Sequence, residues 1–321
     1  MSADTAISWA DSTWTPVRAM RLAPQEDGTV KRRIGWHCEH VSPGCVNCYS
    51  ERLNRFIGTG QEFKPAHLVH VTRLGDVRGD VTVFLDEKML TQPLRWKRGR
   101  RIFVCSMTDL FADFVTDEII DRMFAVMALA PQHTYQVLTK RSGRMREYFA
   151  NPIREALIGR QVGLLELERS GNLGAEWSGL PMPHVWLGVS AEDQQRADER
   201  VPDLLATPAA VRFVSIEPML GPVSFEGLFA SGRINDGTNA LEALDLVICG
   251  GESGGRKARP FVLGHAKEIV RQCKAAGAPV HVKQLGARPV NREGVPHPIS
   301  DRSGAILADW PEELRVQELP A

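Results

Sequence analysis

The sequence has no long apolar stretch and no recognisable export signal. No hydrophobic run in the 321-residue chain approaches the roughly 18 residues that a membrane-spanning helix needs. The first residues, MSADTAISWADSTW, lack the basic start and the apolar core of a signal peptide. We therefore expect a cytoplasmic protein without a membrane partner.

The chain also lacks net charge and is poor in cysteine. Lys+Arg and Asp+Glu both number 39, so no overall basic field indicates a nucleic acid, and any such partner must be held by a local patch. Six cysteines, three of them crowded near the N-terminus, do not form the framework of a secreted disulfide protein. The length and the 43% hydrophobic content fit a globular body of enzyme size.

Short apolar runs alternate with segments of helical period, which is typical of βα units around a parallel sheet. Helices are predicted at Thr116–Ala130 and at Gly264–Ala276, and a shorter initial strand just before Cys38. Six further strands are predicted at Arg101–Ser106, Thr134–Thr139, His184–Ser190, Val211–Ile216, Asp245–Gly250 and Pro279–Gln284.

Two stretches interrupt this alternation and are interpreted as insertions. Residues 151–183 contain the helix-like run ALIGRQVGLLELERS, and residues 230–243 are rich in Gly, Asn and Asp. The proline-containing residues 287–321 are expected to form a polar tail that wraps the surface without extending the sheet. The predicted organisation is an N-terminal arm over 1–33, one α/β body over 34–286, and this tail.

Three cysteines form the strongest motif: Cys38, Cys45 and Cys48 in the run GWHCEHVSPGCVNCYSERLNRF. Thiolates are soft ligands that suit iron–sulfur clusters and zinc. Pro43-Gly44 supplies a turn that folds the six-residue gap between the first two cysteines back on itself. Because only three thiolates are evident, a four-iron cluster would keep one iron open to a substrate or cofactor. We predict an iron–sulfur loop.

Two alternatives remain open for this trio. A structural zinc site is closed and four-coordinate, so it would need His37 or His40 as a fourth ligand. The other alternative is three ordinary cysteines. The remaining thiols, Cys105, Cys249 and Cys273, are expected in the core, although the first two lie near strand ends and could return a hydrogen atom to a product radical.

Polar residues follow every one of the six strands. In a parallel α/β barrel the carboxyl ends of the strands face a common site, so these residues together predict a cavity at the mouth where the cysteine loop would sit. They are Ser106 to Asp109, Thr139 to Arg141, Ser190 with Glu192, Glu217-Pro218, Gly250 to Gly254, and Lys283-Gln284.

Three side chains at these ends are predicted to be catalytic. Pro218 holds Glu217 at the rim, and Lys140 and Lys283 occupy equivalent rim positions from which they could contact carboxylate or phosphate. In the run CGGESG the glycines let the backbone approach a ligand, and Glu252 can accept hydrogen bonds from an ammonium group. Solvated side chains at ordinary turns are the alternative at each position.

An ordered series of segments resembles a known family: GWHCEHVSPGCVNCYSERL, CSMTDLFADFV, QVLTKRSGRM, VWLGVSAEDQQRADERVPDLL, VRFVSIEPMLGPV and VICGGESG. Together they look like the phage Gp37/Gp68 family, also called DUF5131, which is similar to radical S-adenosylmethionine (radical SAM) enzymes. The likeness extends from Ile7 to Gly286. It implies a partial (β/α)6 radical-SAM-like TIM barrel, a [4Fe-4S] cluster on the three cysteines, and S-adenosylmethionine on the open iron. Reductive cleavage would then give a 5′-deoxyadenosyl radical that abstracts hydrogen from a substrate.

The resemblance also implies the cofactor contacts. The chain departs from the superfamily in the longer first gap between cysteines and in Asn47, which stands where an aromatic residue normally precedes the third cysteine. The Gly-Gly-Glu run follows a late strand, so Glu252 is left open between cofactor and substrate. The residues expected to contact the cofactor are Tyr49, Ser106, Thr139, Ser190, Glu192, Gly250, Gly251 and Glu252.

The implied substrate is a nucleic-acid base or a modified nucleotide, in DNA or free, for a lyase or isomerase reaction with an external electron donor. A partner protein is left open. Three basic clusters could meet phosphates: Arg32-Arg33, Lys140-Arg141 with Arg144, and Arg256-Lys257 with Arg259. The competing predictions are a noncatalytic zinc-stabilised nucleic-acid-binding module and an iron–sulfur accessory electron carrier.

Overall fold

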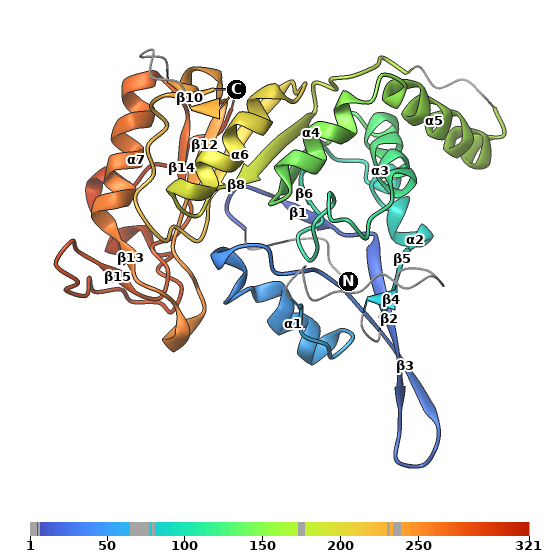
Figure 1. The fold of residues 1–321 in the computed structure, drawn as a ribbon, viewed down its shortest axis with the longest axis horizontal. Coiled ribbons are helices and arrows are strands. Elements are labelled where there is room, and N and C mark those ends of the chain that lie inside the picture. Colours follow the sequence, from blue (N-terminus) through green and yellow to red (C-terminus); the bar gives the residue numbers. More distant parts are fainter. Residues whose placement is uncertain are drawn as a thin grey trace. The chain divides into compact units, whose positions relative to one another are not determined.

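The computed structural model divides the chain into two compact units (Figure 1). Unit 1 comprises Met1–Thr5, Ala10–Val137 and Tyr148–Val185, and unit 2 comprises Ala6–Trp9, Leu138–Glu147 and Trp186–Ala321. The structure describes residues 5, 7–64, 77–78, 81–172, 177–229, 232–233 and 239–320.

A seven-stranded sheet forms the core. The pairings β1–β6, β6–β7, β8–β9, β9–β12 and β12–β14 are all parallel. Its strand order is β1-β6-β7-β8-β9-β12-β14, so β1 and β14 are the edge strands. All residues of β8, β12 and β14 are buried, as expected for strands covered on both faces. The strands are β1 (Ser12–Trp14), β6 (Arg101–Val104), β7 (Thr134–Thr139), β8 (Val185–Ser190), β9 (Val211–Ile216), β12 (Leu246–Cys249) and β14 (Val280–Val282).

The predicted mixed α/β class and all six predicted strands are confirmed, with ends trimmed by up to two residues. The sequence did not indicate β1, a three-residue strand that pairs with β6 at Ser12↔Ile102 and Trp14↔Val104. The partial (β/α)6 barrel and the single body over 34–286 stay predictions.

In unit 1, helices α3 (Asp117–Leu129) and α5 (Arg154–Ser170) pack against each other. Thr116 caps α3 by accepting a hydrogen bond from the Ile119 amide at 3.4 Å, which confirms the predicted start of this helix. Helix α5 is the helix-like run within the first predicted insertion, and it ends at Gly171 in the left-handed conformation. Two shorter helices complete the unit, α1 (Tyr49–Ile57) and α2 (Glu87–Leu90).

In unit 2, helix α7 (Leu263–Ala276) contacts β12 and β14, and α6 (Gln194–Ala206) contacts β9 (Figure 1). Gly277 ends α7 with φ 72°, a conformation that favours glycine, so the predicted helix end is confirmed. Helix α4 spans Ser142–Ala150. Across the described parts of the chain, no helix has the length and apolar content needed to cross a membrane.

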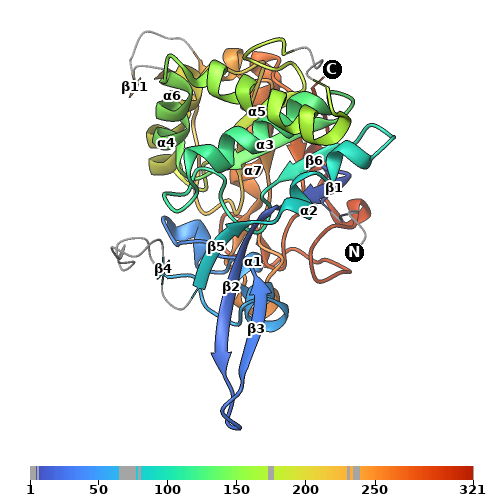
Figure 2. The same ribbon diagram turned by 90° about the vertical axis from the view of Figure 1, so that its right-hand side faces the viewer.

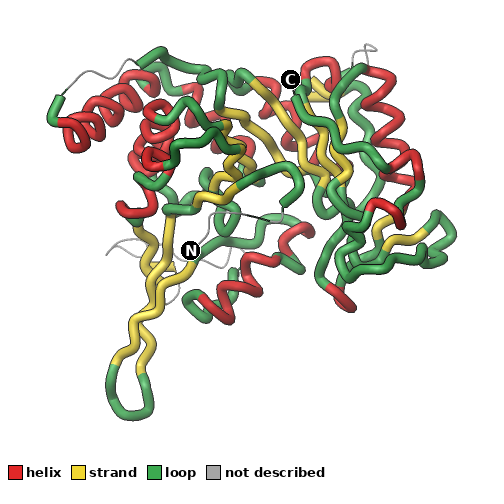
Figure 3. The backbone as a smooth tube through the Cα atoms, turned by 180° about the vertical axis from the view of Figure 1, so that it is seen from behind, coloured by secondary structure: helices red, strands yellow, loops and turns green. Residues whose placement is uncertain are grey.

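Unit 1 also contains an antiparallel sheet of order β3-β2-β5-β4, which the sequence did not reveal (Figure 2). Its strands are β2 (Val17–Pro24), β3 (Val30–Gly35), β4 (Val77–Arg78) and β5 (Val81–Leu85). The expected initial strand before Cys38 is β3, but it pairs antiparallel with β2 and is not part of the parallel sheet. Figure 3 shows β2 and β3 side by side up to the turn that joins them.

The second predicted insertion lies only partly within the described residues. Residues 230, 231 and 234–238 fall outside them, as do residues 173–176 of the first insertion. Two short sheets pair β10 (Leu228–Phe229) with β11 (Gly232–Arg233), and β13 (Phe261–Val262) with β15 (Pro289–Val290).

The C-terminal tail does extend the sheet, contrary to expectation. The Val282 amide donates to the Val316 carbonyl at 2.9 Å, the Glu318 amide donates to the Val280 carbonyl at 3.0 Å, and Gln317 bridges antiparallel to His281. These backbone bonds cover the outer edge of β14. Two apolar side chains of the tail, Trp310 and Leu314, are buried.

We expect the Leu314→Ala variant to lose about 2 to 5 kcal/mol of unfolding free energy, because Leu314 is fully buried and its removal leaves a cavity. Leu307→Ala is the matched control in the same tail, since Leu307 is 44% exposed and its loss should change stability by less than about 0.5 kcal/mol. Urea denaturation of the two variants measures both effects. Equal stability of the two would show that the tail is not a packed part of unit 2.

Candidate functional site

The cysteine loop is a series of tight turns that ends on a helix. The Cys45 amide donates to the Ser42 carbonyl at 3.0 Å, and the Cys48 amide donates to the Cys45 carbonyl at 3.2 Å. Helix α1 begins directly after Cys48, which occupies its N-cap position. The predicted turn at Pro43 is confirmed by a 3-10 helix at Pro43–Cys45. All three cysteines of the loop are partly exposed.

Two hydroxyl groups at the start of α1 attach the loop to the segment that follows β6. Tyr49 Oη donates to the Ser106 carbonyl at 2.5 Å, and Ser50 Oγ donates to the Met107 carbonyl at 2.7 Å. The hydroxyl of Ser50 is buried, so its bond is shielded from water. Tyr49 and Ser106 were predicted as site residues and lie together. Ser50 was not predicted, and its only sequence signal is its place directly after Tyr49.

A third hydrogen bond joins the same two segments from the opposite side. Thr108 Oγ1 donates to the His37 carbonyl at 2.6 Å. The cysteine loop therefore lies at the carboxyl end of β6, where active sites form in parallel α/β folds. This agrees with the predicted position of the loop relative to the first polar strand end.

Asn54 fixes the far side of α1. Its side-chain oxygen accepts from the Trp36 amide at 2.9 Å and the Thr59 amide at 3.1 Å, and its nitrogen donates to Thr59 Oγ1 at 2.8 Å and the Gln61 carbonyl at 3.0 Å. The side chain is fully buried, and its two bonds to Thr59 form away from solvent. Gly58 and Gly35 allow this approach, because an added Cβ on either would lie within 2.5 Å of Asn54 Oδ1.

The two histidines proposed as a fourth zinc ligand differ in their surroundings: His40 is paired, whereas the buried His37 Nε2 has no hydrogen bond within the described part of the chain. His40 Nε2 lies 2.6 Å from Glu51 Oε2, a pair that ties the loop to α1. The His37 ring is buried and packs edge-on against Phe114 at 4.8 Å between ring centroids. Neither side chain is placed as a ligand beside the cysteines.

The donor set can be compared with the two kinds of metal site. A tetrahedral zinc ion with Zn–S bonds of about 2.3 Å would bring its sulfur ligands to about 3.8 Å from one another. Among the described residues, no three His, Cys, Asp or Glu side chains form a group that could hold a metal ion. A four-iron cluster bonds each cysteine to a different iron and so spaces the sulfurs more widely. The three cysteines are partly exposed thiols of one loop, and the binding of a four-iron cluster by them stays a prediction.

In unit 2, polar strand ends are joined in two pairs. Lys283 Nζ lies 3.2 Å from Glu217 Oε1, and Lys140 Nζ donates to Ser190 Oγ at 3.1 Å. The three predicted catalytic residues thus fall in these two pairs. The Lys283–Glu217 pair is partly exposed, with side-chain exposures of 23% and 14%, so a ligand in solvent can reach both.

The two glycines of the CGGESG run serve close packing of strand ends. A Cβ on Gly250 would lie 2.8 Å from Glu217 Oε1 and 3.3 Å from the Gln284 carbonyl, and one on Gly251 would overlap the Leu285 carbonyl. The Gly251 amide donates to the Gln284 carbonyl at 3.0 Å. Here the glycines bring the segment after β12 against the segment after β14.

Two carboxylates predicted to contact the cofactor form ion pairs with nearby arginines. Glu192 is fully buried and accepts from Arg200 at 3.0 Å. Glu252 accepts from the Arg259 amide at 2.8 Å and from its guanidinium. Arg200 lies eight residues after Glu192, and Arg259 lies seven residues after Glu252. No sequence pattern indicated either pairing. Thr139, also predicted, is buried and accepts from the Arg141 amide at 2.9 Å.

The three remaining cysteines are core residues. Burial, with Asp109 and Cys38 nearby, raises the pKa of the Cys105 thiol well above its usual value. Burial also raises the pKa of Cys249, and it raises the pKa of Cys273 to about 12. Cys105 sits at the end of β6 with φ 55°, a left-handed conformation that is uncommon for a residue with a side chain.

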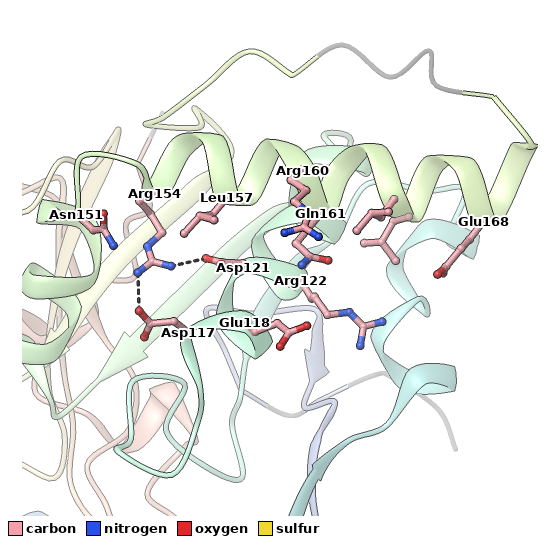
Figure 4. Close-up of a pocket in the computed structure, with 12 residues that line it drawn as sticks. Asp117, Glu118, Asp121, Arg122, Asn151, Arg154, Leu157, Arg160, Gln161 and Glu168 are labelled. Carbon is pink, nitrogen blue, oxygen red and sulfur yellow. Dashed lines mark hydrogen bonds and ion pairs between the residues drawn. The ribbon is translucent and has the colours of Figure 1, made fainter.

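A groove of about 670 Å³ runs between α3 and α5 in unit 1 (Figure 4). Arg154 is buried at one end, donates to Asp117 at 2.5 Å and Asp121 at 2.9 Å, and stacks over the Tyr148 ring at 3.9 Å. Tyr148 Oη donates to Asp121 as well, at 2.6 Å. One guanidinium group thus binds two carboxylates, and the network holds α5 against α3.

Comparison with known proteins gives one family. A family model described as "Protein of unknown function (DUF5131)" matches residues 27–305. No curated protein and no solved structure matches the chain.

We expect alkylation of the folded, metal-free protein to separate the six cysteines into two groups. Cys38, Cys45 and Cys48 are partly exposed and should react with iodoacetamide. Cys105, Cys249 and Cys273 are buried with raised pKa values, so little reactive thiolate is present near neutral pH, and they should react only after denaturation. Peptide mass spectrometry measures each site. Reaction of Cys249 as fast as Cys45 would contradict this burial.

Proposed function

Because the chain belongs to the DUF5131 family, whose description assigns no function, we propose the function that the resemblance of its sequence segments implies: a radical SAM enzyme with a partial (β/α)6 barrel. Cys38, Cys45 and Cys48 bind a [4Fe-4S] cluster, and the substrate is a base in a nucleic acid or a modified nucleotide. A cytoplasmic location suits the six cysteines, none of which forms a disulfide.

One observation carries this proposal: three partly exposed cysteines lie on a loop that is hydrogen-bonded to the carboxyl end of a parallel strand. Structural zinc loops have no need of that position. A loop that takes part in catalysis does, because substrate-binding groups gather at the carboxyl ends of the strands. The hydroxyl groups of Tyr49, Ser50 and Thr108 bond to main-chain carbonyls and so fix the loop against the segment that follows β6.

The roles of the loop residues follow from this geometry. The three thiolates would hold the cluster, and with S-adenosylmethionine bound the cluster would supply the electron for its reductive cleavage. Tyr49 and Ser50 orient the loop through the Ser106 and Met107 carbonyls. The pair of His40 and Glu51 closes the outer side of the loop.

In unit 2, Lys283 and Glu217 supply the charge that meets the substrate or the cofactor. Their partial exposure lets an anionic group compete for the lysine ammonium, and a cationic group compete for the carboxylate. Lys140 at Ser190 offers a second ammonium group. Glu192 and Glu252 are held by Arg200 and Arg259 and are less suited to a direct ligand role. That these groups share one cavity with the cysteine loop stays a prediction.

The test measures metal content and reaction product together. After anaerobic reconstitution the native chain should be brown, with about four irons and four sulfides per chain, and reduction with S-adenosylmethionine should yield 5′-deoxyadenosine. Cys45→Ala should lose both the colour and the product, because one of the three thiolates is gone. Cys273→Ala, which removes a buried thiol outside the loop, is the matched control and should keep both.

The competing functions give different results. A colourless protein with one zinc per chain would overturn the proposal in favour of a zinc-stabilised binding module. An intact cluster without 5′-deoxyadenosine would indicate an accessory electron carrier.

A further inference from the structure

The hairpin of β2 and β3 reaches well beyond the strand that supports it. Six residue pairs join the two strands, from Ala19↔Gly35 to Pro24↔Val30, whereas β5 accompanies β2 only as far as Arg21↔Val81. We call the part beyond β5, residues 22–32, the ribbon (Figures 1 and 3). Every residue from 24 to 32 is exposed. A two-stranded ribbon without a core beneath it gains little stability from its own packing, so its length requires another explanation.

The turn of the ribbon is well formed. Asp27 accepts from the Thr29 amide at 2.9 Å and from its hydroxyl at 2.6 Å, and the Gln25 amide donates to the Thr29 carbonyl at 2.8 Å. Gly28 has φ 79°, which a residue with a side chain rarely adopts. The ribbon is therefore a defined surface, and the charge of Asp27 is directed into the turn.

The hairpin is basic although the chain is neutral overall. Residues 17–35 contain five Arg or Lys and two acidic residues. Arg18 is occupied, since it donates to the Gly35 carbonyl at 3.0 Å and stacks on Trp36. Lys31 and Arg32 are exposed, and within the described part of the chain neither side chain has a hydrogen bond or ion pair. The two acidic residues of the ribbon, Glu26 and Asp27, lie at its turn, away from these cations in the sequence. These two cations are available to a partner.

The other predicted basic clusters are less available. Arg259 is bound to Glu252, and Lys140 donates to Ser190. The side chain of Arg256 lies outside the described residues. Of the clusters predicted to meet phosphates, the Arg32-Arg33 pair lies on the most exposed element, and Arg33 is held in place by a 3.0 Å bond to the Gly58 carbonyl.

We propose that the ribbon docks on duplex DNA, with Lys31 and Arg32 contacting phosphates. A two-stranded ribbon fits the major groove of B-form DNA, which is about 12 Å wide, whereas the corresponding groove of duplex RNA is too narrow for side chains to enter. Because successive side chains of a strand point to opposite faces, Lys31 and Arg32 can reach the phosphates on the two sides of the groove. Leu22 and Val30, 58% and 59% exposed, offer apolar contact to sugars and thymine methyl groups at the groove edge.

Docking through the ribbon does not require the cysteines, so it can be tested apart from the radical chemistry. The full-length reconstituted protein is titrated into a fluorescein-labelled DNA duplex of mixed sequence, without S-adenosylmethionine, across a series of salt concentrations. Lys31→Ala/Arg32→Ala should bind at least about tenfold more weakly at low salt, and the salt dependence of log K should be shallower by about 2, one phosphate contact for each lost cation. Each single variant should show about half the change in slope.

Lys97→Ala/Arg98→Ala is the matched control. It removes the same neighbouring Lys-Arg pair from another exposed stretch, so the net charge changes equally. The control should bind like the native chain, and melting temperatures should show that both variants fold. If the control weakens DNA binding as much as the ribbon variant does, the effect comes from the change in net charge alone and the proposal is wrong. Unchanged DNA binding by the ribbon variant would also overturn the proposal. Equal weakening for duplex and single strand would overturn the docking in the groove.

Formation of 5′-deoxyadenosine, measured on the same variants, separates this proposal from the function proposed above. If the ribbon variant and its control both form 5′-deoxyadenosine and both bind DNA like the native chain, the docking proposal is wrong and the proposed radical SAM function stands. Loss of product from Cys45→Ala with unchanged DNA binding would support the ribbon as an independent binding element.

Discussion

The attachment of the cysteine loop to the backbone after β6 is the interaction on which the candidate site depends. Three hydroxyl groups, from Tyr49, Ser50 and Thr108, each bond to a main-chain carbonyl of the facing segment. Because the acceptors belong to the main chain, these contacts depend only on the three hydroxyl donors and on the path of the backbone. Without it, three cysteines on a surface turn would have no defined relation to any strand end, and no catalytic role could be assigned to them.

The parallel strands were predictable because burial on both faces leaves a continuous apolar run in the sequence. Neither β1 nor the ribbon has such a run. Strand β1 is the short segment Ser-Thr-Trp, and it is recognisable only through its pairing with β6. The ribbon is exposed on both faces and so lacks the alternation that marks a half-buried strand. The pairing of the tail with β14 uses main-chain groups, which leave no pattern in the sequence.

At the candidate site, the sequence located polar residues at the strand ends but not their partners. Parallel strands bring their carboxyl ends to one edge, so a list of polar residues after strands follows from the strand assignment alone. Pairing depends on the path of the next segment. Glu192 meets Arg200 on helix α6, and Glu252 meets Arg259 beyond a turn, so each carboxylate has an ion-pair partner that the sequence did not indicate. Lys283 and Glu217 form a partly exposed pair, and they keep the catalytic role proposed for them.

The pairing between the tail and β14 has a consequence for aggregation. When residues 316–318 are displaced from β14, its outer edge has unpaired amides and carbonyls. An uncovered edge of a buried, apolar strand is a template for strands of other chains. A chain in which this segment has come off the sheet would therefore be prone to aggregation, so the tail protects an exposed strand edge as well as packing against unit 2.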